Sequence, residues 1–185
     1  LNRPTPKENR MADKKIVLKN VEVNWAKLFD AAPKWQSTEL EYSIDVKVND
    51  QLAKLMKDYK LNKQTKNKDT AFNGADFITL KLDEKTKNGW VRYGEVFDKE
   101  GNPSSDLVGN GSKVNLFVSL GDSPYGNIIK LGHLEDLDRD KKEMFLNFCQ
   151  VMELVDYDVP SAVIRSNATV AAVDAAPVEE MSIEF

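Results

Sequence analysis

The segment LEYSIDVKVNDQLAKLMKDYK, residues 40–60, decides the fold class, because a strand pattern passes directly into a helix pattern. From Tyr42 to Val48, apolar and polar residues alternate, which is typical of a half-buried strand. From residue 50 onward, apolar side chains recur every three or four residues, as on one face of a helix, with Asp50 as the expected N-cap. These apolar positions are Leu52, Leu55, Met56 and Tyr59.

The rest of the chain repeats the strand pattern. Period-two alternation predicts strands at 15–23, 40–48, 77–82, 90–97, 113–120 and 144–155, and a shorter one at 125–131. Clusters of Gly, Asn, Asp and Ser between them predict turns. The segment 24–35 is expected to be an excursion after the first strand, and the polar segment 134–143 a helical turn on the surface. Short strands with one clear α-helix predict a mainly β fold, a small Greek-key β-barrel.

The composition is that of a globular protein, and it argues against a disulfide, a zinc site and a membrane span. The chain has 185 residues, of which 41% are hydrophobic and 30% are charged, as in an ordinary globular protein. With one cysteine and one histidine, the chain forms no disulfide within itself and no zinc site built from thiolates and imidazoles. No apolar run reaches the roughly 20 residues of a membrane span. We therefore expect no cofactor, no metal and no membrane.

The two ends differ from the body. Met11 resembles a natural start, so residues 1–10 are interpreted as an expression scar. Residues 11–158 are expected to form the folded domain. Residues 159–185 are rich in Ala, Val and Ser without periodicity, which predicts a flexible, disordered tail.

Charge is distributed unevenly along the chain. Residues up to Met152 contain 25 Lys and Arg against 23 Asp and Glu, a net charge of +2, whereas the remainder contains one Arg against seven acids, a net charge of −6. The chain ends on a phenylalanine, which offers a ring and a carboxylate together. We expect the tail to interact either with a partner protein or with the basic surface of its own domain. The candidate tail-interaction residues are Asp174, Glu179, Glu180, Glu184 and Phe185; a functionless acidic end is the alternative.

The sequence gives little support for an enzyme. His133 is expected in a loop and Cys149 in the middle of a strand, where a buried thiol behaves as a small hydrophobe. The carboxylates at 135–140 lack the spacing of a calcium loop, and a solvated face is the simpler interpretation. A metal-dependent nuclease built on these carboxylates is a third, weaker alternative.

Lysines and aromatic residues together point to nucleic acid. Binding of a single strand without sequence preference needs cations for phosphates and flat side chains for bases. The candidate phosphate-binding residues are Lys47, Lys60, Lys63, Lys66, Lys68, Lys81, Arg92, Lys113 and Lys130. The candidate stacking residues are Trp90, Tyr93, Phe117 and Tyr125. A solubilising charged surface and aromatics packed in the core are the alternatives, and Trp25, Phe29 and Trp35 are expected to cap the barrel.

The run W-x-x-L-F followed by Y-S-I-x-V, from Trp25 to Val46, resembles phage-type single-stranded DNA-binding proteins of the OB-fold class. The layout of residues 14–158 and the acidic tail ending in Phe are similar to that family as well. The resemblance implies an OB-fold-like barrel that coats single-stranded DNA in phage replication, recombination or repair, in the cytoplasm of the bacterial host. It also implies recruitment of replication proteins through the tail. The tail is also similar in logic to those of bacterial single-stranded DNA-binding proteins, which end in acids followed by Pro-Phe, whereas this chain ends in Ile-Glu-Phe.

A second class of function stays open at this point. A β-barrel of this composition also suits a structural or interaction module of a phage particle with no role on nucleic acid. The sequence leaves the oligomeric state, including a homodimer, open.

Overall fold

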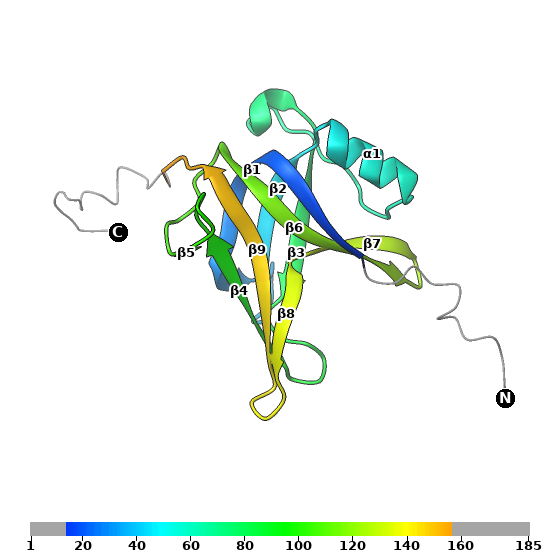
Figure 1. Cartoon of the computed structure of the whole chain (residues 1–185). Helices are drawn as coiled ribbons and strands as arrows, with labels where there is room; N and C mark the ends of the chain where they lie inside the picture. Colours follow the sequence, from blue (N-terminus) through cyan, green and yellow to red (C-terminus); the bar gives the residue numbers. More distant parts are fainter. Residues whose placement is uncertain (1–13, 157–185) are drawn as a thin grey trace. The chain divides into compact units, whose positions relative to one another are not determined.

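The computed structural model describes residues 14–156, which form one strongly curled β-sheet with a single α-helix packed beside it (Figure 1). The elements follow in the order β1 (Lys14–Pro33), β2 (Leu40–Lys47), α1 (Asp50–Asp58), the 3-10 turn η2 (Phe72–Gly74), β3 (Phe77–Asp83), β4 (Val91–Phe97), β5 (Pro103–Ser104), β6 (Ser112–Ser123), β7 (Gly126–Leu131), β8 (His133–Asp138) and β9 (Glu143–Glu153). The expectations for residues 1–10 and for the tail 159–185 lie outside the described residues.

The sheet curls so that β3, at one end of the strand order, meets β4 near the other end. The order is β3-β2-β1-β6-β9-β4-β5, with β7 added beside β6 and β8 beside β9. All neighbours are antiparallel except β4 and β9, which run parallel. The backbone N–H of Arg92 donates to the Glu84 carbonyl (2.7 Å), so the start of β4 returns to the end of β3. A mainly β, OB-fold-like Greek-key barrel with one α-helix is thus confirmed for the described residues.

Strand β1 is longer than the sequence suggested. The segment 24–35, expected to leave the sheet, continues as strand to Pro33, so that expectation was wrong. The register against β2 shifts between Asn24 and Lys27, which is a β-bulge. The bulge bends β1, and the strand can therefore pair with β6 through its first part and with β2 through its second. The alternation was hidden because the extra residue breaks the period of two.

The helix covers one opening of the curled sheet. Its N-cap is Asn49 rather than the expected Asp50, since the Asn49 side chain accepts from the Leu52 N–H (2.9 Å). Leu52 is fully buried. The Gln51 side-chain amide makes two hydrogen bonds to the backbone of β1. Its oxygen accepts from the Lys19 N–H (2.8 Å), and its nitrogen donates to the Val17 carbonyl (3.0 Å). These contacts dock α1 onto the first part of β1.

Strand β8 replaces the helical turn expected in the segment 134–143. Residues His133–Asp138 pair with the first part of β9, and the hairpin turns at 139–142. Glu135 and Asp136 are exposed, and the polarity of the segment is what favours a turn when the sequence is read alone. Pairing with a long apolar neighbour decided the strand instead, which is a tertiary effect that local composition does not report.

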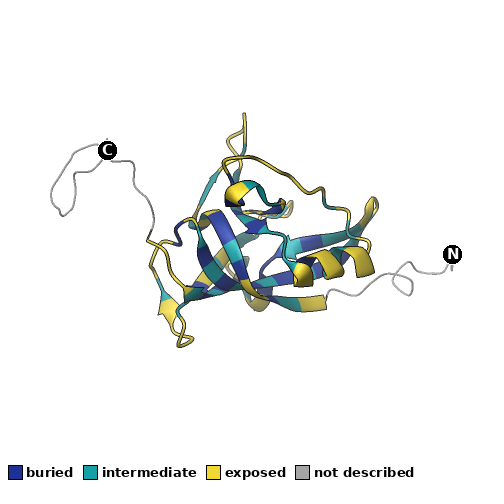
Figure 2. Ribbon diagram, turned by 90° about the horizontal axis from the view of Figure 1, so that it is seen from above, coloured by how far each residue is buried: buried dark blue, intermediate teal, exposed yellow. Residues whose placement is uncertain are grey.

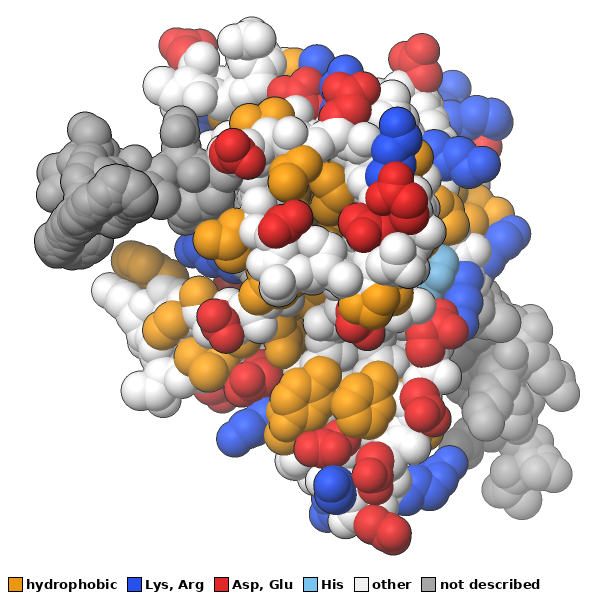
Figure 3. Space-filling model, turned by 60° about the vertical axis from the view of Figure 1, so that its left-hand side comes forward, with side chains coloured by type: hydrophobic (Ala, Val, Ile, Leu, Met, Phe, Trp, Pro, Cys, Tyr) orange, Lys and Arg blue, Asp and Glu red, His pale blue; other side chains and the backbone are white. Residues whose placement is uncertain are grey.

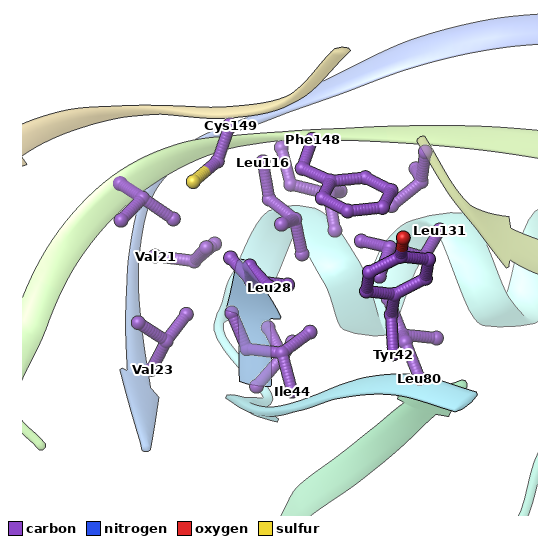
Figure 4. Close-up of a cluster of buried hydrophobic side chains, with 14 of the residues drawn as sticks. Val21, Val23, Leu28, Tyr42, Ile44, Leu80, Leu116, Leu131, Phe148 and Cys149 are labelled. Carbon is purple, nitrogen blue, oxygen red and sulfur yellow. The ribbon is translucent and has the colours of Figure 1, made fainter. Parts of the chain in front are cut away.

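The core lies inside the curl of the sheet. Figure 4 shows side chains from β1, β2, β3, β6, β7 and β9 pointing toward one another, with the Tyr42 ring beside Phe148. Those two rings meet edge to face at 5.1 Å. Figure 2 shows the buried positions inside the sheet, while the loops and the outer side of α1 are exposed. Cys149 is part of this core, and its burial raises the pKa of the thiol to about 12.

Candidate nucleic-acid interface

The outer surface of β1, β2 and β3 is a wall that gathers lysines from three segments of the chain. In the register of the sheet, Ser43 on β2 lies between Lys27 on β1 and Lys81 on β3. Paired residues point to the same side of a sheet, and the neighbours Tyr42 and Ile44 are buried inside. Lys27 and Lys81 therefore project outward from the same row. We call this surface, formed by Lys27, Lys63, Lys66 and Lys81 on β1, β3 and the 60–68 loop, the lysine wall.

A second row of polar groups runs beside the first. Asp45 of β2 pairs with Thr79 of β3, and the Thr79 hydroxyl donates to the Asp45 carboxylate (2.7 Å). The Lys66 ammonium donates to the Thr79 hydroxyl (3.2 Å). The Lys66 backbone exchanges two hydrogen bonds with Phe77 (2.8 and 2.9 Å), which fixes the 60–68 loop along the edge of β3. Lys66 is thereby held on the wall instead of reaching freely into solvent.

Lys63 is the third lysine of this cluster, and its surroundings disfavour a positive charge. It is half-buried, and this burial lowers the pKa of its ammonium. The positive charges of Lys66 and Lys81 lower the same pKa further. The charges of Lys66 and Lys81 thus lie close enough to disfavour the charged form of Lys63 in the free protein. An anion placed between them relieves that repulsion.

Trp25 stands at the bulge of β1 in a strained backbone conformation. Its φ is +50°, a left-handed value that bulky residues rarely adopt. The Asn110 side chain accepts from the backbone N–H of Trp25 (2.7 Å), and the Asn24 side chain accepts from the backbone N–H of Gly111 (3.0 Å). Trp25 is nevertheless 57% exposed, so packing of its ring does not compensate for the backbone strain. Backbone strain of this kind, held in place by two side-chain hydrogen bonds, is typical of functional sites.

Trp35 lies in the loop between β1 and β2 and is 86% exposed. The loop is closed by a hydrogen bond from the Lys34 N–H to the Glu39 carbonyl (2.9 Å). The Lys34 ammonium also pairs with Glu39 (3.2 Å) and with Asp83 (2.9 Å), and these contacts raise its pKa. The loop is therefore tied to the end of β3, while its tryptophan faces water.

A pocket of about 690 Å³ opens at this end of the barrel, between the β1–β2 loop and the segment that joins β3 to β4. Its lining carries both signs of charge, including Glu39, Glu84, Lys85, Lys87 and Arg92. The Arg92 guanidinium donates to the Asp83 carbonyl (2.7 Å), and its partial burial lowers its pKa. Arg92, a candidate for binding phosphate, thus lies in the pocket wall and not on the lysine wall.

The other candidate phosphate residues are spread over several places. Glu22 of β1 lies between two of them. It is the register partner of Lys113 on β6, and its carboxylate forms an ion pair with the Lys47 ammonium at 3.8 Å. Lys60 and Lys68 are exposed at the two ends of the 60–68 loop. Lys130 is on β7. Of the nine candidates, the structure brings Lys63, Lys66 and Lys81 together, and none of the nine assignments is tested by it.

The four aromatic candidates do not share one surface. Tyr125 is 85% exposed at the tip of the β6–β7 hairpin, and Tyr93 is 44% exposed on β4. Phe117 of β6 is half-buried against the ring of His133 (5.1 Å between centroids). Trp90 is partly buried before β4, where its backbone N–H donates to the Thr86 hydroxyl (3.0 Å). Their roles stay predictions.

Sequence reasoning passed over Trp25, Trp35 and Lys27. Both tryptophans were expected to cap the barrel, and both are more than half exposed, so that expectation was wrong for them, whereas Phe29 packs against the core. The signal for Trp35 was available, because it stands in the polar run KWQSTE at a turn. No local signal reveals Trp25, since its exposure results from a bulge fixed by a distant loop.

Neither a metal-binding cluster nor a membrane-spanning helix is found among residues 14–156. Among residues 14–156, no group of three or more His, Cys, Asp or Glu side chains is arranged to hold a metal ion. Within the same range, no helix is long and apolar enough to cross a membrane.

The chain is similar to solved structures of phage proteins. No family model and no curated protein matches it. The crystal structure of gp2.5, a single-stranded DNA-binding protein encoded by bacteriophage T7, matches with 15% identity and a TM-score of 0.49, over 87% of this chain and 100% of that one. A C-terminally truncated single-stranded DNA-binding protein from bacteriophage Enc34 matches with 14% identity and a TM-score of 0.44, over 78% and 88% of the two chains. The Enc34 protein in complex with single-stranded DNA matches with 15% identity and a TM-score of 0.39, over 79% and 88%.

Proposed function

We propose that this protein binds single-stranded DNA along the lysine wall, without sequence preference and without catalysis. The observation that carries the proposal is the convergence of Lys63, Lys66 and Lys81 on one face, with a depressed Lys63 pKa that an anion would relieve. Phosphates supply that anion at regular intervals. The resemblance of the sequence to phage single-stranded DNA-binding proteins points in the same direction.

Base stacking is the second part of the proposal. Trp25 and Trp35 are both exposed and lie at the bulge and at the end of β1, the strand that carries Lys27. Stacking on aromatic rings tolerates any base, because every base has a π-face. Lysines that contact the DNA phosphates and indoles that stack on the bases together give affinity that does not depend on the DNA sequence.

The biological setting is also a proposal. Protection of single strands during phage replication, recombination or repair follows from such binding, in the cytoplasm of the bacterial host. We further propose that Asp174, Glu179, Glu180, Glu184 and Phe185 recruit replication proteins and compete with DNA for the lysine wall. The charge of −6 from Glu153 onward supports this role. A homodimer remains compatible with it.

The test is a titration of a fluorescently labelled oligonucleotide at several salt concentrations. For single strands, the slope of log K against log salt is about −0.7 for each phosphate neutralised, so four lysines predict a slope of about −3. A duplex of the same sequence is expected to bind much more weakly. Absence of binding at low salt would contradict the proposal and favour the alternative, a structural module of a phage particle.

A further inference from the structure

A second aromatic surface lies on β4 and β9, on a different wall of the barrel. Tyr93 and Phe145 are cross-strand neighbours whose rings stack with centroids 5.7 Å apart and planes 20° from parallel. They are 44% and 38% exposed. The adjacent residues Gly94 and Leu146 face inward, toward Phe148, so the stacked rings lie on the outer side of the sheet.

Carboxylates surround this ring pair. Partial desolvation raises the pKa of the Tyr93 phenol, and the nearby carboxylates of Glu143 and Glu84 raise it further. Asp136 of β8 is the register partner of Phe145, and Glu95 stands two residues after Tyr93 on the same face of β4. We call this surface, formed by Tyr93, Phe145 and these four acids, the acid–aromatic face.

The strands that carry this face are strongly acidic. Strands β4, β8 and β9 contain six acids and a single base, Arg92, whose guanidinium is engaged with the Asp83 carbonyl. Lys141, Lys142 and Arg139 lie at the tip of the β8–β9 hairpin. Figure 3 shows the molecule from the side of β4 and β5, with hydrophobic side chains set among acidic ones. Such a surface repels phosphates.

We propose that the acid–aromatic face is a docking site for a basic, lysine- or arginine-bearing segment of a partner protein. A guanidinium or ammonium placed over the stacked rings gains cation–π attraction, and the carboxylates at the rim supply its counter-charges. Aromatic anchors with a polar rim are also the usual composition of protein interfaces. This site is independent of the lysine wall, so the protein can hold DNA and a partner on different walls.

The test uses the full-length protein, uniformly labelled with ¹⁵N, and tetra-arginine as the probe. Backbone amide shifts in 91–97, 133–138 and 143–147 are expected to move on titration. Tyr93→Leu, which keeps the apolar bulk but removes the ring, is expected to weaken binding at least threefold. Glu95→Gln combined with Asp136→Asn is expected to weaken it at least fivefold.

A matched pair of substitutions controls for net charge. Glu100→Gln combined with Asp69→Asn removes the same two charges from exposed positions in other loops, and its affinity for tetra-arginine is expected to stay within twofold of the wild type. Equal weakening by both pairs would overturn the proposal, because it would show a general charge effect. Shifts confined to other residues, or self-association through this face in the absence of peptide, would also overturn it.

Discussion

The hydroxyl of Tyr42 on β2 donates a hydrogen bond of 2.8 Å to the backbone carbonyl of Arg92 on β4, and so links two strands that are not neighbours in the sheet. The bond spans the seam at which β3 and β4 meet. Tyr42 is 4% exposed, and its burial raises the pKa of the phenol to about 12. The barrel is therefore closed in part by a side chain.

Removing this hydroxyl tests the closure of the barrel. Tyr42→Phe is expected to lower the free energy of unfolding by about 1 kcal/mol, because the Arg92 carbonyl loses its partner. Since the phenol pKa is raised on folding, its stabilising effect is complete below pH 10 and is lost between pH 10 and about 12. Tyr42→Phe is expected to remove that alkaline loss, as measured by urea unfolding across this pH range.

Tyr59→Phe is the control for that measurement. The Tyr59 hydroxyl accepts a hydrogen bond from the exposed Lys14 ammonium (2.8 Å). Its loss is expected to change stability by no more than about 0.5 kcal/mol. Equal losses in the two variants would show that the seam bond has no special role.

Position 94 requires a glycine, because the ring of Phe148 leaves no room for a side chain there. A Cβ at this position would overlap the ring of Phe148 far inside van der Waals contact. Gly94→Ala is therefore expected to destabilise the protein by about 1–3 kcal/mol, as overpacking does. In a double-mutant cycle, adding Phe148→Leu is expected to recover part of this loss. Strict additivity of the two changes would contradict the steric explanation.

The exposed tryptophans are expected to matter for DNA and not for folding. Trp25→Ala and Trp35→Ala should each weaken single-strand binding by about 1–3 kcal/mol, roughly 5- to 150-fold, with little change in melting temperature. Phe117→Ala is the comparison, because Phe117 packs against His133 and its loss should lower stability instead. If Phe117→Ala weakened binding while both tryptophan variants bound normally, the lysine wall would be the wrong surface.

Lys63 gives DNA binding a pH dependence with a definite sign. Its pKa is lowered in the free protein, and a bound phosphate should raise it again. Binding is therefore coupled to proton uptake, and affinity should fall as pH rises from neutrality toward the ordinary lysine value of 10.5. Lys63→Arg should flatten this profile, because arginine stays charged. An unchanged profile in Lys63→Arg would exclude Lys63 as the titrating group.

Deleting residues 170–185 tests the tail. The deletion removes four acids and no base, so single-strand affinity is expected to rise, most strongly at low salt. Full-length protein with the four acids replaced by their amides should behave like the deletion. If affinity were the same with and without the tail at every salt concentration, competition for the lysine wall would be excluded. Recruitment of a partner through Phe185 does not depend on that result.

Alternation along the chain determined the fold class. The strand at 40–48, the helix that follows it and the strands that supply Leu80, Leu116 and Phe148 were predictable, because a buried face imposes its period on the sequence. The sequence also determined the contrast in charge between body and tail, whereas the binding role of the lysines at 60–68 stays a prediction.

Only the tertiary structure decided which candidates lie together. Lys63, Lys66 and Lys81 converge because β3 pairs with β2 on one edge and with the 60–68 loop on the other. Trp25 is exposed because a bulge is clamped by Asn110, which is 85 residues away. Tyr93 has the composition of a stacking residue for DNA, but pairing with β9 and β8 surrounds it with acids. These outcomes depend on register and on long-range pairing, which no local pattern encodes.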